Sequence, residues 1–441
     1  MVLLIIFCCC WASTCARAGL YQLTYSFLKY FIYGVFGLLL FGWFNFFVFY
    51  NWQFFLLSYW HFYFFLMFLV VLFFVYLELL ALHLKLFVWI HIYFYWVGFA
   101  TYIFCLTNSI LVFFFMYESI QLPAIYILYS FTKTLRSLYA AILMCFWTLF
   151  GALLLIICFL YLIYFYTLYT FSAYTIILAS LQNKICFYCC LFIGFGVKIP
   201  IWPASTWLLL AHVEAPTFWS IFLSGAYIKY PAFGLLLFFK LVNVYLYLLV
   251  FNFLLFQLFL TALNIWYQSD LKQLVAIITI CEMQLNLFIL VCFNNLSQFI
   301  WYYLFLGHAW NTTFGFWLVD FITKTYQTRE LRFLSGLTYN SFSFQFYILG
   351  YLFCLGGFPY TFIFWTEWLL CYFNLTLQIY WLLYIIVIYN FGCISLLIIK
   401  WHSVLFGKPA KFIKLRFNRF FFWKFCICLF GNFFLGTLLV I

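Results

Sequence analysis

The sequence predicts an all-α polytopic membrane protein, because of its composition, its length and the absence of strand patterns. Hydrophobic residues make up 70% of the 441 residues, charged residues 6%, and the mean hydropathy is +1.17. These values lie far outside those of soluble domains. A spanning helix with its connection uses about 30 residues, which predicts about fourteen spans. Segments of alternating hydrophobicity are absent, so helices are favoured over a closed barrel.

Hydrophobic runs separated by polar residues place the individual spans. The stretch 2–17 lacks a basic segment before its apolar run, so we expect a first spanning helix there and not a signal peptide. The expected spans are 2–17, 24–50, 52–80, 85–106, 109–130, 137–164, 185–210, 216–240, 242–264, 271–293, 297–321, 342–372, 377–400 and 420–440. Together they form a single membrane domain over residues 1–441.

The distribution of basic residues predicts the orientation. Most lysines and arginines fall near loops that follow odd-numbered spans, and only Lys184 and Lys240 fall near the other side. Loops on the cytoplasmic or matrix side carry an excess of basic residues. Both termini are therefore expected on the outer side, and the basic stretch from Lys400 to Lys424 on the inner side. The net charge of +12 reflects this topology and does not indicate nucleic-acid binding, since no recognition motif accompanies it.

Two of the expected spans are interrupted. The seventh contains Lys198-Ile199-Pro200-Ile201-Trp202-Pro203, and the twelfth contains Gly356-Gly357-Phe358-Pro359. Broken helices expose backbone groups that only protein or a wet cavity can satisfy at membrane depth; the alternative for each is an ordinary proline kink. The spacing of the two breaks suggests two related five-helix halves, about 109–264 and about 271–400.

Four charged residues are embedded in apolar runs. They are Glu118, Lys198, Lys229 and Glu367, whereas most other acids, such as Glu78, sit at span ends. A charge at a helix centre costs about 2.5–3.5 kcal/mol, so these four should be paired, neutralised or hydrated.

Embedded lysines and carboxylates suit proton transfer. A desolvated lysine beside a carboxylate can change its proton occupancy, and His308 could carry a proton between lysines because imidazole titrates near neutral pH. The alternatives are a purely structural ion pair between Glu118 and Lys198 and a packing role for His308.

Cofactor and metal motifs are missing from the sequence. Cys186 and Cys189 form a CxxC among 17 cysteines, but no second pair and no histidine lie nearby, so packing cysteines and no metal are expected. No dinucleotide-binding glycine pattern, P-loop or iron–sulfur spacing occurs.

Several segments match one family in order. They are Gly194–Pro200, Ala211–Pro216, Leu223–Lys229, Gln268–Ala276, Leu306–His308, Thr328–Glu330 and Gly357–Glu367. From about Glu118 to Glu367 the chain resembles subunit 4 of respiratory complex I, the NADH:ubiquinone oxidoreductase. The resemblance implies antiporter-like inverted repeats with broken seventh and twelfth helices.

The resemblance also implies a proton relay. Its members would be Glu118, Lys198, Lys229, His308 and Glu367, with Glu282, His212 and Glu214 as possible additions. An acid at the position of Glu367 distinguishes subunit 4 from its paralogues, subunits 2 and 5. The chain departs from the family at Glu282, where histidine is usual, at Tyr230-Pro231 after Lys229, and at Leu208-Leu209-Leu210.

The implied function is proton translocation by a core membrane-arm subunit of an enzyme whose redox chemistry lies elsewhere. NADH, FMN, iron–sulfur clusters and ubiquinone would be bound by other subunits, and the expected partners are subunits 2 and 5 and lipids. The location would be the mitochondrial inner membrane, with the chain made inside the organelle because a transit segment is not evident. The alternatives are a subunit of a multisubunit sodium/proton antiporter and a purely structural membrane-arm subunit.

Overall fold

The fold is almost entirely α-helical. The computed structural model describes residues 59–81, 88–132, 134–166, 170–171, 184–238, 244–292, 298–336, 342–376, 380–406 and 419–438. Within these ranges the only β-type pairings are two isolated bridges, Ser109 with Thr170 and Asp270 with Glu330. The prediction of an all-α fold is therefore confirmed. The expected spans 2–17 and 24–50 lie outside the described residues.

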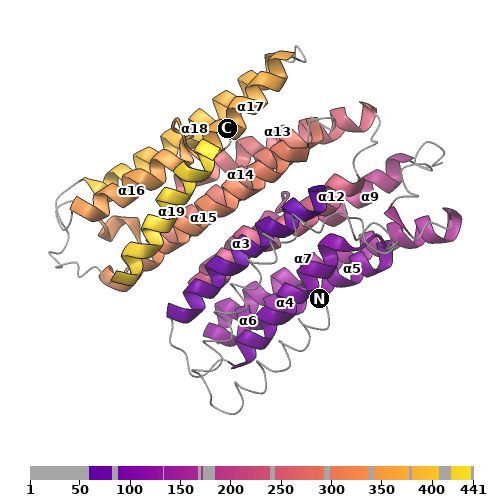
Figure 1. The fold of residues 1–441 in the computed structure, drawn as a ribbon, viewed down its shortest axis with the longest axis horizontal. Helices are drawn as coiled ribbons and strands as arrows, with labels where there is room; N and C mark the ends of the chain where they lie inside the picture. The colour runs from indigo at the N-terminus through magenta and orange to yellow at the C-terminus, as the bar shows by residue number, and fades with distance from the viewer. Residues whose placement is uncertain are drawn as a thin grey trace.

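The helices run side by side as a bundle (Figure 1). In chain order they are α3 (Tyr59–Ala81), α4 (Val88–Leu106), α5 (Ile110–Ser119), α6 (Gln121–Thr132), α7 (Leu135–Tyr166), α9 (Lys184–Gly196), α10 (Ser205–Glu214), α11 (Thr217–Phe222), the π-helix η2 (Leu223–Tyr227), α12 (Lys229–Phe238), α13 (Val244–Tyr267), α14 (Leu271–Cys292), α15 (Gln298–Tyr326), the 3-10 helix η4 (Leu331–Phe333), α16 (Phe342–Leu355), α17 (Phe362–Thr376), α18 (Tyr380–Leu405) and α19 (Arg419–Leu438). In Figure 1, α14 and α15 lie between the α16–α19 group and the α4–α7 group.

Four described helical stretches are long and apolar enough to cross a membrane. They are Ile110–Phe131, Leu135–Phe165, Thr217–Phe238 and Leu271–Ile289. The first two are 44% and 39% buried and the last two are both 89% buried, so the first pair lies at the periphery and the second pair in the interior. The expectations of about fourteen spans and of two five-helix halves stay predictions.

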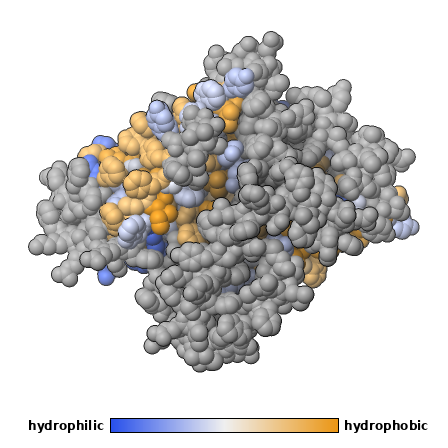
Figure 2. Space-filling model, viewed as in Figure 1, coloured by the Kyte–Doolittle hydropathy of each residue, from blue (hydrophilic) through white to orange (hydrophobic). Residues whose placement is uncertain are grey.

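The outer surface of the bundle is apolar. Along α7, side chains such as Leu135, Ile142, Phe146, Leu153 and Tyr164 are exposed. Figure 2 shows hydrophobic residues gathered on one face, with more hydrophilic residues toward the edges of that group. An apolar surface of this extent suits a lipid environment, because soluble monomers rarely expose one.

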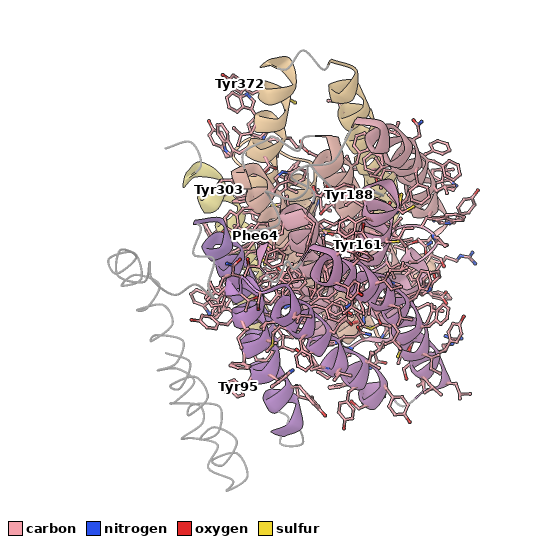
Figure 3. All side chains as sticks on the ribbon, turned by 90° about the vertical axis from the view of Figure 1, so that its right-hand side faces the viewer. Phe64, Tyr95, Tyr161, Tyr188, Tyr303 and Tyr372 are labelled. Carbon is pink, nitrogen blue, oxygen red and sulfur yellow. The ribbon has the colours of Figure 1, made fainter. Side chains whose placement is uncertain are left out.

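Aromatic rings fill the interior. Phe64 packs between Phe233 and Phe305, at centroid distances of 4.8 and 6.0 Å, and lies near the middle of the view in Figure 3, with Tyr372 and Tyr95 near its upper and lower edges. Five tryptophans are fully buried: Trp207, Trp219, Trp301, Trp317 and Trp401. Because each aromatic side chain buries about 150–250 Å², such contacts dominate the packing between helices.

Both predicted helix breaks are present. The seventh expected span divides after α9, and the chain runs through turns over residues 197–204 before α10 begins at Ser205 and continues to Glu214. The twelfth divides between α16 and α17 over residues 356–361. Lys198 lies inside the first break. Gly357 lies inside the second, with a φ of 60° that suits glycine.

A third irregularity occurs in the expected span 216–240. The π-helix η2 joins α11 to α12 and ends two residues before Lys229. A π-turn widens the helix and changes which carbonyls find a backbone donor, and such turns occur frequently at functional sites. The sequence pattern gave no indication of it.

Candidate functional site

Glu118 and Lys198 form an ion pair inside the bundle. The Lys198 Nζ lies 2.9 Å from Glu118 Oε1, and the exposed fractions of the two side chains are 2% and 22%. The ammonium also lies 3.8 Å from the centroid of the Tyr117 ring, where the ring quadrupole attracts a cation. These two embedded charges are therefore paired with each other. Removing either partner would leave an uncompensated charge in the interior.

The backbone break that carries Lys198 is satisfied by side chains from three helices. Trp207 Nε1 on α10 donates to the Val197 carbonyl at 3.0 Å. The Pro200 carbonyl accepts from Gln257 Nε2 on α13 at 3.2 Å and from Gln284 Nε2 on α14 at 3.0 Å. Carbonyls that lose their helical donor at membrane depth need such partners. The two glutamines were not singled out in the sequence, although each is a polar residue inside an apolar run.

Replacing both glutamines tests this account of the break. We expect Gln257→Leu together with Gln284→Leu to destabilise the protein by about 1–3 kcal/mol, since a buried carbonyl loses both donors. Either single variant should have the smaller effect, because one donor remains. The thermal unfolding midpoint in detergent measures both. A double variant as stable as the parent would contradict the account.

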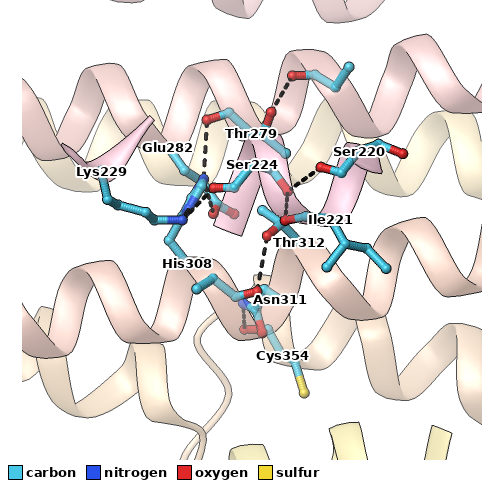
Figure 4. Close-up of polar contacts among 12 residues, drawn as sticks. Ser220, Ile221, Ser224, Lys229, Thr279, Glu282, His308, Asn311, Thr312 and Cys354 are labelled. Atoms are coloured by element: carbon cyan, nitrogen blue, oxygen red, sulfur yellow. Dashed lines mark hydrogen bonds and ion pairs between the residues drawn. The ribbon is translucent and has the colours of Figure 1, made fainter. Parts of the chain in front are cut away.

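Lys229 and His308 form the centre of the site (Figure 4). The Lys229 Nζ donates to the Ser224 carbonyl at 2.5 Å and lies 2.6 Å from His308 Nδ1. Ser224 belongs to η2, so the π-turn offers the lysine an acceptor on its own chain. Both Lys229 and His308 are buried. The lysine is held between a backbone acceptor and an imidazole.

The contacts of His308 define its tautomer. An ammonium can only donate, so Nδ1 accepts from Lys229 when the lysine is charged, and the ring proton then sits on Nε2. His308 Nε2 lies 3.2 Å from the Thr279 carbonyl and 3.6 Å from Glu282 Oε2. The imidazole therefore has a proton donor on one nitrogen and proton acceptors at the other.

Glu367 lies at the second helix break. Its Oε2 would be 2.9 Å from a Cβ added at Gly357, so the carboxyl group packs against that glycine. A Cβ added at Gly307 would lie 2.7 Å from Cδ1 of Phe362, and glycine is thus needed for the close approach of α17 to α15. Gly307 directly precedes His308, so this approach brings the start of α17 close to the segment that carries the central histidine.

A cavity joins His308 to Glu367. Its volume is about 70 Å³, and its polar lining includes Glu282, Asn286, His308, Glu367 and Tyr389. One water molecule needs about 10–15 Å³ of such space and two to four polar partners. The cavity therefore has the size and the lining to hold several water molecules between the imidazole and the two carboxyl groups.

His212 and Glu214 lie apart from these contacts. His212 is buried and stacks on Phe316 of α15, with centroids 5.1 Å apart. Glu214 is the last residue of α10, whose end is fixed by Lys272 Nζ donating to the Val213 carbonyl at 3.2 Å. Among the described residues, neither His212 nor Glu214 takes part in an ion pair.

A second buried ion pair was not predicted. Lys424 on α19 pairs with Glu78 on α3, and both side chains are buried. The charge pattern had placed Lys424 in a basic stretch and Glu78 at a span end, but the structure brings both into the bundle. Asp320 and Lys324 form a further pair within α15, at 2.5 Å. The packing of α3 and α19 against α15 brings the two residues together, so spacing along the chain could not show the pair.

The described part of the chain holds no group of three or more histidine, cysteine, aspartate or glutamate residues suited to a metal ion. The cysteines in it, including Cys186 and Cys189, are free thiols. The expectation that the chain carries no metal or cofactor stays a prediction.

The helical bundle with two broken helices and buried lysine–acid contacts defines an all-α membrane protein with paired charges in its interior. The chain belongs to the NADH:quinone oxidoreductase/Mrp antiporter transmembrane family, whose model matches residues 107–392. Among its relatives is NADH-ubiquinone oxidoreductase chain 4 of Paramecium tetraurelia, 31% identical over 313 residues, which are 69% of this chain and 64% of the relative. The protein of the same name from Acanthamoeba castellanii is 30% identical over 242 residues, 53% of this chain and 48% of the relative.

The matched part of the chain therefore spans between about half and two thirds of these curated relatives. The fold is similar to a chain in the structure of the Mrp complex from Dietzia sp. DQ12-45-1b, with a TM-score of 0.69 and 15% sequence identity. That match covers 79% of this chain and 67% of the other. The polytopic all-α architecture expected from the sequence is thus found in a solved structure.

Proposed function

We propose that this chain is a core membrane-arm subunit of respiratory complex I and translocates protons across the mitochondrial inner membrane. The observation that carries the proposal is the series of buried proton-binding groups, with Lys198 paired to Glu118 and Lys229 hydrogen-bonded to His308. The names of the curated relatives support the choice of complex. In this proposal NADH, FMN, the iron–sulfur clusters and ubiquinone are bound by other subunits, and subunits 2 and 5 and lipids are the neighbours.

Each contact supplies one step of proton transfer. Glu118 stabilises the protonated form of Lys198, so a change in the charge or position of Glu118 favours release of the lysine proton. Lys229 takes up a proton as an amine and, as an ammonium, passes it to His308 Nδ1 over the 2.6 Å contact. Glu367 receives the proton beyond the central pair. Burial excludes bulk water, so protons pass between these groups and not to solvent.

The rival is a subunit of a sodium/proton antiporter, which the Mrp-like fold also allows. The curated relatives named for the respiratory enzyme favour the proposed complex over this rival. Native separation of detergent-solubilised membranes, with chymotryptic peptide mapping of the band that oxidises NADH, distinguishes the two. Finding the chain only in a smaller assembly without NADH oxidation would favour the antiporter.

The proposed conduction is tested with Glu118→Gln and Lys198→Met in sealed membrane vesicles. We expect both variants to lower NADH-driven proton uptake through this chain by about tenfold or more, since a positioned proton-transfer group contributes about 10²–10⁴-fold. The proton-to-electron ratio is the measurement. Glu330→Gln makes the same chemical change as Glu118→Gln at an exposed loop position and should leave that ratio unchanged. A normal ratio in both variants would point to a purely structural subunit.

A further inference from the structure

Glu282 lies beside the pair formed by Lys229 and His308, on a different helix from either residue. It lies on α14, one turn after Thr279, and its Oε2 is 3.6 Å from His308 Nε2. Lys229 contacts the opposite nitrogen of the same ring at 2.6 Å. The imidazole is therefore enclosed between an ammonium and a carboxylate (Figure 4). Among the described residues, Glu282 is the acid that forms an ion-pair contact with His308.

Glu282 also faces the cavity that leads to Glu367. Both carboxyl groups line this cavity of about 70 Å³ together with His308. Glu282 Oε2 has no protein hydrogen-bond partner among the described residues although it is buried. A buried carboxylate oxygen without a partner is costly unless water or a proton satisfies it. The cavity supplies the space for that water, since one molecule needs about 10–15 Å³.

We propose that Glu282 is the group that accepts the proton from His308 Nε2 and passes it through the cavity to Glu367. This inference rests on the proposed conduction and names the step that follows the central pair. The Lys229 ammonium gives a proton to His308 Nδ1, and the imidazolium gives its Nε2 proton to the Glu282 carboxylate. The resulting carboxylic acid passes a proton across the cavity to the Glu367 carboxylate. At the end of this sequence His308 carries its proton on Nδ1, Lys229 is a neutral amine that can take up the next proton, and Glu367 holds the transferred proton.

The titratable groups around Glu282 are limited and come from several helices. They are Lys229, Cys281, His308, Tyr351, Glu367, Tyr389 and Cys393. His308 is the base in printed contact with the Glu282 carboxylate, and Glu367 is the other carboxyl group in the cavity wall. Two carboxyl groups that line one cavity with room for water offer a short route for a proton.

The competing role for Glu282 is that of a fixed negative charge that balances Lys229. The two roles require different chemistry at position 282. A relay needs a group that binds and releases a proton, which a histidine can also do. A fixed counter-charge needs a carboxylate, and histidine cannot replace it because imidazole is neutral or positive.

The test compares Glu282→Gln, Glu282→Asp and Glu282→His in sealed vesicles that contain the assembled complex. We expect Glu282→Gln to lower NADH-driven proton uptake through this chain at least about tenfold, and Glu282→Asp and Glu282→His to recover most of it. Infrared difference spectra should show a carboxylic-acid carbonyl band that changes during turnover and is lost in Glu282→Gln. Native electrophoresis confirms assembly, and Glu330→Gln is the matched exposed control.

Two results would overturn the inference. Recovery in Glu282→Asp without recovery in Glu282→His would assign the fixed negative charge. Normal proton uptake in Glu282→Gln would remove the residue from the route. Lys198→Met, measured in the same vesicles, separates a failure of this inference from a failure of the proposed function. If Lys198→Met lowers proton uptake and Glu282→Gln does not, only the step through Glu282 is wrong. Normal uptake in both variants rejects proton conduction by the chain.

Discussion

Lys229→Met and Lys229→Arg are both expected to reduce proton transfer through this chain by about 10²-fold, the contribution of one positioned proton-transfer group. Methionine removes the donor that lies 2.6 Å from His308 Nδ1. Arginine keeps the positive charge, but a guanidinium does not release its proton in proteins. The measurement is the proton-to-electron ratio in sealed vesicles.

The arginine variant separates two roles of the lysine. If Lys229 acts only as a fixed charge that orients Glu282 and His308, arginine should preserve most of the proton uptake. If the lysine itself carries the proton, arginine should be as defective as methionine. Assembly is checked by native electrophoresis, since arginine is larger and position 229 is buried. Normal uptake in Lys229→Arg would exclude Lys229 as a proton carrier.

Lys424→Met is expected to destabilise the protein by about 3–5 kcal/mol, the usual cost of removing one partner of a buried ion pair. Its partner Glu78 is fully buried and would keep an uncompensated charge between α3 and α19. Replacing both residues, as Glu78→Leu with Lys424→Met, should recover most of the stability, because the apolar pair carries no desolvation penalty. The thermal unfolding midpoint in detergent and the level of the chain in membranes report both effects.

Lys324→Met is the matched control for this pair. Lys324 pairs with Asp320 four residues earlier on α15, but its side chain is 48% exposed. Exposed pairs contribute about 0.2–1 kcal/mol, so the variant should stay near the stability of the parent. Equal losses in Lys424→Met and Lys324→Met would show that burial of the Glu78 pair is not what stabilises the contact.

The sequence predicts the fold class and the two helix breaks because each follows from local chemistry. Hydrophobic runs indicate helices, and the prolines around Lys198 and near Gly357 interrupt them at the positions where the structure does. The π-helix before Lys229 was not predicted, since its residues Leu223–Tyr227 also suit an ordinary α-helix. Its presence depends on packing with other helices.

The candidate site was predicted as a set of residues but not as an arrangement. Glu118 and Lys198, 80 positions apart, and Lys229 and His308, 79 positions apart, are brought into contact by the packing of separate helices. The embedded charges signalled that partners were required but not which ones. The pair of Glu78 with Lys424 was missed because both residues lie close to the ends of hydrophobic runs. A charge there has a low desolvation cost, so the sequence gives no sign that it needs a partner. The role of each residue in proton transfer stays a prediction.

The glutamine contacts at the first helix break connect the two charged centres mechanically. Pro200 follows Lys198 by two positions, and Gln284, which donates to its carbonyl at 3.0 Å, follows Glu282 by two positions on α14. This hydrogen bond links the turn that carries Lys198 to α14, which carries Glu282 beside the Lys229–His308 pair. If the turn shifts when Lys198 changes its charge, either α14 moves with it or this hydrogen bond breaks. Movement of α14 would change the distance between His308 Nε2 and Glu282 Oε2.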